Sequence, residues 1–303
     1  MSTPWNIRLQ RTAWYAKSTW AYYRARRLGL VGHEFFRFGR ALGWEMYRNN
    51  TNLPWDLLVT PVSSTRYYEF NFARECLPAD PGVCLDVSSP ILFDFYVARN
   101  YPSARLHMIN PDTRDMDRTR AYMRNLTLPP IHTDVSDVSR MPACPGGYDT
   151  IWSLSVVEHI QGETANDSTA VKAMFDALRP GGRLILTVPT DKSFQVEYRE
   201  KDLYGTQSTA AGQKRETYFF QRVYDEAAIQ DRLIRPLGLA PTRIEWYGET
   251  TPGRFSEYIR RWQLDGKNTT IWDPLEMARF YRLYDTGSAM PGAGVCGLLF
   301  IKP

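Results

Sequence analysis

Between residues 81 and 190, short apolar runs of strand length alternate with segments of helical pattern, and this alternation limits the chain to few folds. Val83–Val87, Thr150–Leu154 and Leu184–Val188 are three such runs, each bounded by turn residues or by a helical segment. Strands without polar alternation are typical of a parallel sheet that is covered by helices on both faces. We therefore expect an α/β domain built on a mostly parallel sheet.

The rest of the C-terminal half contains further strands and two long insertions. The insertions cover residues 190–224 and 248–294 and are too long to be simple connections. We expect a helix at residues 225–234, strands at 242–247 and 295–301, and a second helix at 274–284 within the second insertion.

Residues 1–66 have a helical pattern and an uneven charge. Residues 1–50 carry nine Lys or Arg against two acids, a local charge of +7 in a chain whose net charge is +4. Aromatic residues recur there at helical spacing, which predicts two helices packed on the main body with solvated arginines. The same pattern suits a lid over a ligand, an oligomer contact such as a homodimer interface, or peripheral contact of residues 1–50 with anionic membrane lipids.

Composition excludes several classes of protein. Of the 303 residues 43% are hydrophobic and 23% are charged, which excludes a disordered chain. No apolar run approaches the roughly 18 residues of a membrane span, so no transmembrane segment is expected. The four cysteines form no CxxC pair, which predicts reduced thiols and a cytoplasmic protein. Because the basic charge is local, no nucleic-acid partner is expected.

Four short motifs, in this order, resemble the Rossmann-like class I S-adenosylmethionine-dependent methyltransferases. They lie at residues 85–87, 132–135, 148–160 and 178–189, and the resemblance covers residues 81–303. It implies a Rossmann-like seven-stranded, mostly parallel sheet with helices on both faces and an antiparallel final strand. With the patterns above, it divides the chain into an N-terminal helical segment, 1–66, and a methyltransferase-like domain, 67–303.

The resemblance also implies which residues bind S-adenosyl-L-methionine. They are Asp86, Val87, Ser88 and Ser89 in the first turn, Asn110 and Asp112 after the second strand, Asp134 and Val135 after the third, and Ser153 and Leu154 in the fourth. The first turn departs from the family, because Ser88 and Pro90 stand where it has glycines. Serine is small enough for a close backbone approach, and proline suits the first position of a helix. Asn110 replaces the usual acid and binds a hydroxyl as a neutral partner.

Glu158 and His159 are the candidate catalytic residues. Methyl transfer to a hydroxyl needs a proton acceptor with a pKa near neutrality, which suits His159; the alternative is a structural His159 at the start of a helix. One carboxylate and one imidazole make a poor metal site, so no metal is expected. His107 and His132 fall inside predicted strands and are expected to be core or sheet-surface residues.

The first insertion combines aromatic rings with arginines, which suits a sugar, a phenol or an anionic small molecule. Arg199, Arg222 and Tyr224 are the candidate substrate residues there. The sequence therefore predicts a methyltransferase that acts on a hydroxyl or amine of a small molecule, such as a saccharide or secondary metabolite. Two alternatives stay open: transfer or cyclisation of the aminocarboxypropyl arm of the same cofactor, and a non-catalytic Rossmann-like binding protein.

Overall fold

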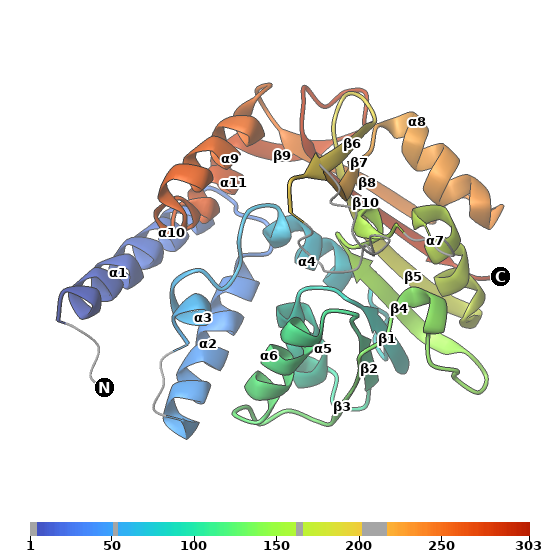
Figure 1. Cartoon of the computed structure of the whole chain (residues 1–303), viewed down its shortest axis with the longest axis horizontal. Helices are drawn as coiled ribbons and strands as arrows, with labels where there is room; N and C mark the ends of the chain where they lie inside the picture. Colours follow the sequence, from blue (N-terminus) through green and yellow to red (C-terminus); the bar gives the residue numbers. More distant parts are fainter. Residues whose placement is uncertain (1–4, 51–53, 162–165, 202–216) are drawn as a thin grey trace, which may run out of the picture.

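The computed structural model describes residues 5–50, 54–161, 166–201 and 217–303. An eight-stranded sheet of order β3-β2-β1-β4-β5-β10-β8-β9 forms its centre (Figure 1). The strands from β3 to β5 are parallel, and β10 is antiparallel to both of its neighbours. The predicted mostly parallel sheet with an antiparallel last strand is thus confirmed, with one additional strand. The strands of this sheet are β1 (Val83–Val87), β2 (Arg105–Ile109), β3 (Ile131–Asp134), β4 (Tyr148–Leu154), β5 (Leu178–Thr190), β8 (Arg243–Glu249), β9 (Tyr281–Tyr284) and β10 (Gly294–Ile301).

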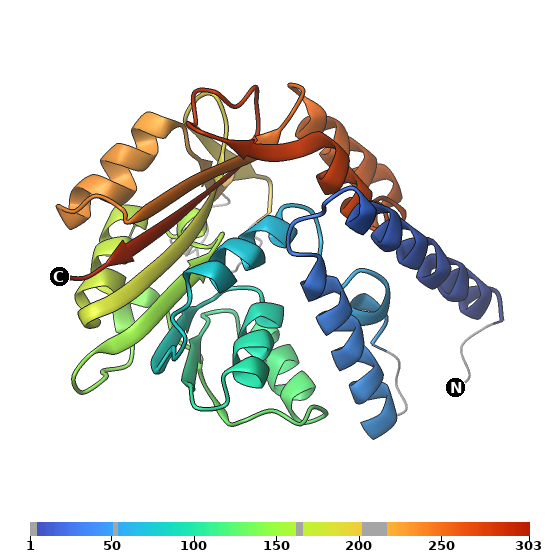
Figure 2. The ribbon, with the colours of Figure 1, turned by 180° about the vertical axis from the view of Figure 1, so that it is seen from behind.

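Helices cover both faces of the sheet, as Figures 1 and 2 show. On one side lie α4 and α5, and on the other lie α7 and α8. The helices are α1 (Trp5–Arg27), α2 (His33–Asn49), α3 (Trp55–Val59), α4 (Arg66–Cys76), α5 (Ile91–Asn100), α6 (Thr113–Met123), α7 (Asp167–Asp176), α8 (Glu226–Ile229), α9 (Arg254–Asp265), α10 (Lys267–Thr270) and α11 (Asp273–Phe280). Short turns of 3-10 or π-helix lie at η1 (Val138–Arg140), η2 (Val157–His159), η3 (Gln230–Ile234) and η4 (Arg235–Leu237).

Alternate residues of the strands enter two separate hydrophobic cores. On one face Trp152 and Ile185 pack with the aromatic residues of α2, α4 and α5. On the other face Ile151 and Leu184 pack with α7 and η3. This division follows from the two-residue period of a strand, and burial on both faces explains why the strand sequences are continuously apolar.

The N-terminal helices are part of the first core. Phe35 of α2 is fully buried, and its ring lies 5.2 Å from that of Phe70 in α4 and 4.7 Å from that of Tyr96 in α5. Helix α1 packs along α11, and Trp20 of α1 meets Trp272 edge-on. The structure therefore gives α2 an extensive apolar contact with the 67–303 region.

One prediction about the second insertion is wrong in its boundary, and the first insertion contains a hairpin that was not predicted. The helix predicted over residues 274–284 ends at Phe280, and Tyr281–Tyr284 forms β9 instead, because these residues pair antiparallel with β8 at the edge of the sheet. The first insertion contains a hairpin of β6 (Gln195–Arg199) and β7 (Tyr218–Val223). Its residues 202–216 lie outside the described part of the chain.

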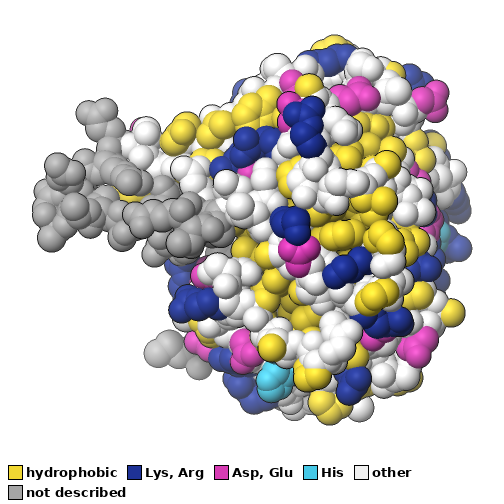
Figure 3. Space-filling view, turned by 90° about the vertical axis from the view of Figure 1, so that its right-hand side faces the viewer, with side chains coloured by type: hydrophobic (Ala, Val, Ile, Leu, Met, Phe, Trp, Pro, Cys, Tyr) yellow, Lys and Arg dark blue, Asp and Glu magenta, His cyan; other side chains and the backbone are white. Residues whose placement is uncertain are grey.

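The distribution of surface charge, the character of the helices and the state of the cysteines can be compared with the expectations from composition. On the face shown in Figure 3, basic side chains are scattered among acidic and apolar ones and form no continuous patch. Within the described ranges, no helix has the length and apolar character that crossing a membrane requires. All four cysteines are free thiols, of which Cys144 is half-buried and the others are buried.

Candidate active site at the carboxyl edge of the sheet

The turn after β1 has the shape that glycine usually provides. Ser88 has a positive φ of 58°, and its backbone N–H and hydroxyl both donate to the carbonyl of Ile109, at 2.9 and 3.1 Å. A left-handed conformation costs a non-glycine residue about 1–2 kcal/mol, and these two bonds offset part of that cost. The hydroxyl of Ser89 accepts from the N–H of Leu154, which ties the turn to β4. The serine-containing turn therefore keeps a tight backbone.

Asp86 is buried at the end of β1, and a second acid lies near it. Its carboxylate accepts from the Ser89 N–H at 3.1 and 3.2 Å, and burial raises its pKa to about 7, against the opposing effect of the Ser89 hydrogen bonds. Asp94 of α5 accepts from the indole N–H of Trp152 at 3.2 Å, and burial and the neighbouring Asp86 raise its pKa well above the usual range. Both carboxyls therefore hold a proton more readily than an exposed aspartate does. The sequence analysis did not identify Asp94.

The residues after β2 bind one another. Asn110 accepts from the Asp112 N–H at 2.9 Å and donates to Asp115 at 3.1 Å. The carboxylate of Asp112 caps α6 by accepting from the N–H groups of Arg114 and Asp115. Both predicted residues lie at the carboxyl edge, defined here as the edge at which β1 to β5 end. Their contact with a ribose stays a prediction.

Asp134 and Val135 follow β3 at the same edge. Oδ2 of Asp134 lies 2.8 Å from Nε2 of His107, and Val135 is half-exposed. The N–H of Asn110 donates to the Asp134 carbonyl, so the ends of β2 and β3 are held together. The structure therefore places Asp86, Asn110 and Asp134 at the ends of three adjacent strands.

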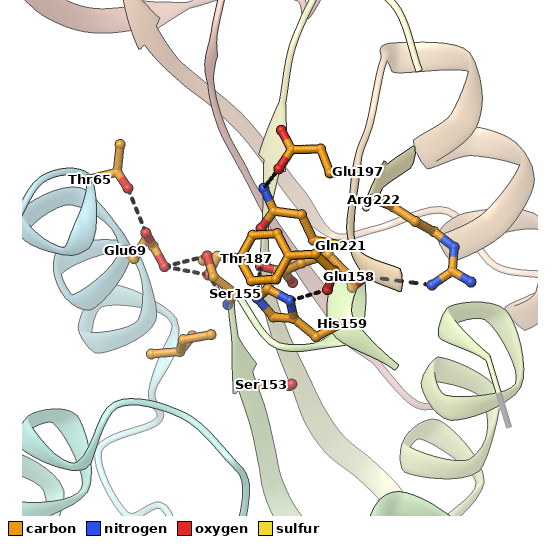
Figure 4. A network of polar contacts seen from close by, with 12 residues as sticks. Thr65, Glu69, Ser153, Ser155, Glu158, His159, Thr187, Glu197, Gln221 and Arg222 are labelled. Carbon is orange, nitrogen blue, oxygen red and sulfur yellow. Dashed lines mark hydrogen bonds and ion pairs between the residues drawn. The ribbon is translucent and has the colours of Figure 1, made fainter. Parts of the chain in front are cut away.

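Glu158 and His159 lie in η2, just after β4 (Figure 4). Ser153 and Leu154 are buried at the end of that strand, and the Ser153 hydroxyl donates to the Val87 carbonyl. Nδ1 of His159 donates to the Phe220 carbonyl at 2.8 Å, and its Nε2 lies 3.8 Å from Oε1 of Glu158. This carbonyl selects the neutral tautomer with the proton on Nδ1, which makes Nε2 the basic nitrogen.

Burial shifts the pKa values of this pair in opposite directions. It raises the pKa of Glu158 to about 8 and lowers that of His159 to about 4. Near neutral pH the glutamate therefore holds its proton while the imidazole is uncharged. A pair of groups with separated pKa values is typical of sites that transfer protons.

These shifts predict a specific dependence of stability on pH. Between pH 6.5 and 8 the folded protein holds a proton on Glu158 that the unfolded chain has released, so the free energy of unfolding falls as the pH rises. We expect Glu158→Gln to remove about 2 kcal/mol of this decline between pH 6.5 and 9, as measured by urea unfolding. The pKa of His159 lies below this window, so His159→Gln should keep the decline. Equal slopes in the wild type and Glu158→Gln would contradict the assignment.

Glu69 of α4 is the central residue of a buried polar cluster that the sequence analysis missed. Its carboxylate accepts from the hydroxyls of Ser155 at 2.7 Å, Thr65 at 2.9 Å and Thr187 at 3.0 Å (Figure 4). It also accepts from Nη1 of Arg66 at 2.5 Å. The glutamate is 1% exposed. Arg66 also donates to the Leu154 carbonyl, so the start of α4 is bonded to the ends of β4 and β5. The only signal in the sequence is a charged residue among aromatic ones on a helix.

The three predicted substrate residues have different surroundings. Arg199 lies on the exposed hairpin, 4.6 Å from the ring centre of Phe220. Arg222 and Tyr224 are buried, and both contact Asp167: the tyrosine hydroxyl donates to it at 2.9 Å, and the arginine forms an ion pair at 3.6 Å. Within this structure these two side chains join the hairpin to α7, and their contact with a substrate stays a prediction.

Comparisons with known proteins agree with this geometry. Residues 90–186 match the family model of a methyltransferase domain. This segment runs from the turn after β1 through the Glu158–His159 pair to β5, and the sheet is mostly parallel with an antiparallel last strand, as the resemblance implies. The predicted resemblance to class I methyltransferases is confirmed. Asn110, Asp112, Asp134, Val135, Ser153 and Leu154 lie within the matched segment, and Asp86, Val87, Ser88 and Ser89 directly precede it.

Solved structures with a similar architecture are distant in sequence. Coclaurine N-methyltransferase, crystallised with N-methylheliamine and S-adenosylhomocysteine, is 14% identical with a TM-score of 0.49, over 97% of this chain and 91% of that one. Geranyl diphosphate C-methyltransferase from Streptomyces coelicolor is 13% identical with a TM-score of 0.46, over 78% and 76%. The [4+2]-cyclase SpnF is 16% identical with a TM-score of 0.42, over 77% and 79%. No curated protein matches the chain.

Proposed function

We propose that this protein is an S-adenosylmethionine-dependent methyltransferase that acts on a hydroxyl or amine of a small molecule. The observation that carries the proposal is the alignment of Asp86, Asn110 and Asp134 at the ends of β1, β2 and β3. In an open α/β sheet, ligands bind outside the carboxyl ends of the strands where the strand order reverses, here between β1 and β4.

The residues present fit this cofactor. S-adenosylmethionine supplies an electrophilic methyl group on a positively charged sulfur, so nearby carboxyl groups are favourable. Asp86 is a buried carboxyl at the end of β1, and Glu158 is a buried carboxyl in η2, just after β4. Oε2 of Glu158 has no hydrogen-bond partner among the described residues. A buried polar atom without a partner is costly, and a bound cationic or polar ligand removes that cost.

Each predicted residue has a role in this proposal. The turn with Val87, Ser88 and Ser89 approaches the methionine end, and Asn110 and Asp112 bind the ribose hydroxyls. Asp134 accepts from the adenine amino group beside Val135, and Ser153 and Leu154 lie on the sulfonium side. His159 accepts the proton of the nucleophile on Nε2 with the protonated Glu158 beside it, and Arg199, Arg222 and Tyr224 contact the acceptor. A saccharide or secondary metabolite is the proposed acceptor class.

Calorimetry with S-adenosylmethionine tests the cofactor site. Asp86→Ala and Asp134→Ala should each weaken binding by about 1–3 kcal/mol, because each removes a hydrogen-bond partner from a buried polar group of the ligand. Asp117→Ala on α6 is the matched control, since this aspartate is 76% exposed and should leave the affinity unchanged.

Two outcomes would contradict the proposal. Wild-type affinity in both variants, with folding intact by circular dichroism, would show that the pocket is elsewhere. If the wild type gave no heat and no thermal shift with millimolar cofactor, both enzyme interpretations would fail. Where turnover occurs, S-adenosylhomocysteine as the product indicates methyl transfer, and methylthioadenosine indicates use of the aminocarboxypropyl arm.

We further propose that residues 1–66 cover the carboxyl edge as a lid. The contacts of Thr65 and Arg66 with the Glu69 cluster support this, because they hold the end of that segment at β4 and β5. One face of α1 carries Trp20 and Tyr23, both more than half-exposed, together with Arg24 and Arg27, and Trp20 also contacts Trp272. A homodimer contact or a contact with anionic lipids would use this face. A cytoplasmic location completes the proposal.

A further inference from the structure

Two of the four histidines of the chain lie side by side on β2 and β3, the last two strands at one side of the sheet. His107 of β2 and His132 of β3 are register partners, and their ring centres are 4.7 Å apart. Asp134 follows two residues after His132, and its Oδ2 lies 2.8 Å from Nε2 of His107. These three residues are called the His107 cluster below.

The cluster occupies one face of the sheet because its members follow the two-residue period of the strands. Helix α6 covers the opposite face, where Arg120 binds the hydroxyl and carbonyl of Thr133. The cluster is open to solvent, since His132 is exposed and the side chain of Asp134 is 47% exposed. Its candidate ligand atoms all lie within 4.8 Å of one another.

We propose that the His107 cluster binds a divalent transition-metal ion such as Zn²⁺. Two imidazoles and one carboxylate are the ligands that zinc and its neighbours in the first transition row prefer, at about 2.0–2.2 Å from the metal. Small rotations of side chains at the surface bring the three atoms to one centre. Three protein ligands leave at least one coordination position for water, so the site is of the open type.

A plain hydrogen bond between His107 and Asp134 explains only part of this arrangement. It leaves His132 with no role, although this residue lies directly across from His107 in the register. Imidazole is a common metal ligand, and the adjacent rings of His107 and His132 each offer one ligand nitrogen. Metal binding therefore accounts for all three residues with one interaction.

One consequence of this metal site depends on the proposed function, in which Asp134 also binds S-adenosylmethionine. Asp134 is the residue that we assign to the adenine amino group, and the metal would use the same carboxylate. The two ligands should then compete, and by linkage each should weaken the affinity of the other by the same factor.

The experiment uses the full-length chain without an affinity tag. Titration calorimetry with Zn²⁺ at pH 7.5, together with metal analysis after dialysis, should show one ion per chain, and Mg²⁺ should give no comparable binding because it prefers oxygen ligands. His132→Ala and His107→Gln should each reduce the zinc affinity on the order of tenfold or more. His33→Gln and Cys144→Ser are the controls, and they should leave the affinity unchanged, because His33 lies on α2 and Cys144 is the half-buried thiol.

The outcomes separate the metal site from the cofactor site. Absence of stoichiometric zinc binding, or binding that His132→Ala retains and Cys144→Ser abolishes, would overturn the metal site. If zinc binds while S-adenosylmethionine does not, the metal site stands and the proposed function fails. If both bind and zinc leaves the cofactor affinity unchanged, the metal site stands and the shared use of Asp134 is overturned.

Discussion

Replacing Glu69 with alanine should lower the free energy of unfolding by about 3–5 kcal/mol, measured by urea denaturation at neutral pH. The change removes the acceptor of four side chains and leaves the guanidinium of Arg66 without its carboxylate partner. The hydroxyls of Ser155 and Thr187 would also lose a buried acceptor, which adds to the cost. Glu69→Gln should be intermediate, because it keeps an acceptor oxygen and removes the charge.

Glu75 offers a matched control on the same helix. It forms an ion pair with Arg243 at 2.6 Å, but both side chains are more than 30% exposed. Exposed pairs contribute about 0–1 kcal/mol, so Glu75→Ala should have a small effect. A loss in Glu69→Ala no larger than that in Glu75→Ala would show that the buried cluster does not stabilise the carboxyl edge.

Phe35→Ala should destabilise the whole chain by about 3–5 kcal/mol. Phe35 is fully buried against Phe70, Phe93 and Tyr96, which belong to α4 and α5, and its loss leaves a cavity inside the first core. The decrease should appear in a single unfolding transition, followed by both near-UV and far-UV circular dichroism. Tyr47→Ala is the control on the same helix, because Tyr47 is 39% exposed and its loss should cost about 1 kcal/mol.

This variant also tests how residues 1–66 relate to the rest of the chain. A lid that docks without contributing to the core would melt in a separate early transition, and Phe35→Ala would leave the main transition unchanged. That result would favour a separable N-terminal segment. The packing of Phe35 favours the opposite outcome, in which deletion of residues 1–50 exposes the aromatic face of α4 and α5 and the truncated chain does not remain soluble.

The resemblance to the methyltransferases supplied the predicted cofactor residues, and the strand pattern places three of them at one edge of the sheet. Asp86, Asn110 and Asp134 each come directly at or after an apolar run, and parallel strands end at a common edge. These three residues can therefore be assigned to one edge of the sheet without information about contacts between distant parts of the chain. The backbone conformation of Ser88 could not be predicted from the sequence, because only the folded turn shows that this serine occupies the left-handed region.

Other functional candidates depend on residues far apart in the chain. Glu69 lies 86 residues before Ser155 and 118 before Thr187, and Asp167 lies 57 before Tyr224. Helical periodicity marks Glu69 only as a charge among aromatic residues, and it says nothing about which hydroxyls reach it. The same holds for His107 and His132, whose strands were predicted but whose register was not.

The sequence by itself determined the alternation of strands and helices, the mostly parallel sheet and the edge that carries the candidate cofactor residues. These properties are local, since they depend on the period of apolar residues and on the turns between them. The tertiary structure decided the rest: that Tyr281–Tyr284 is an edge strand, that Phe35 belongs to the main core, and that Glu69 bonds to Ser155 and Thr187. Each of these contacts joins residues that are far apart in the sequence. Buried polar groups and edge strands pair with whichever residues the packing of the chain places beside them, and sequence periodicity does not specify those residues.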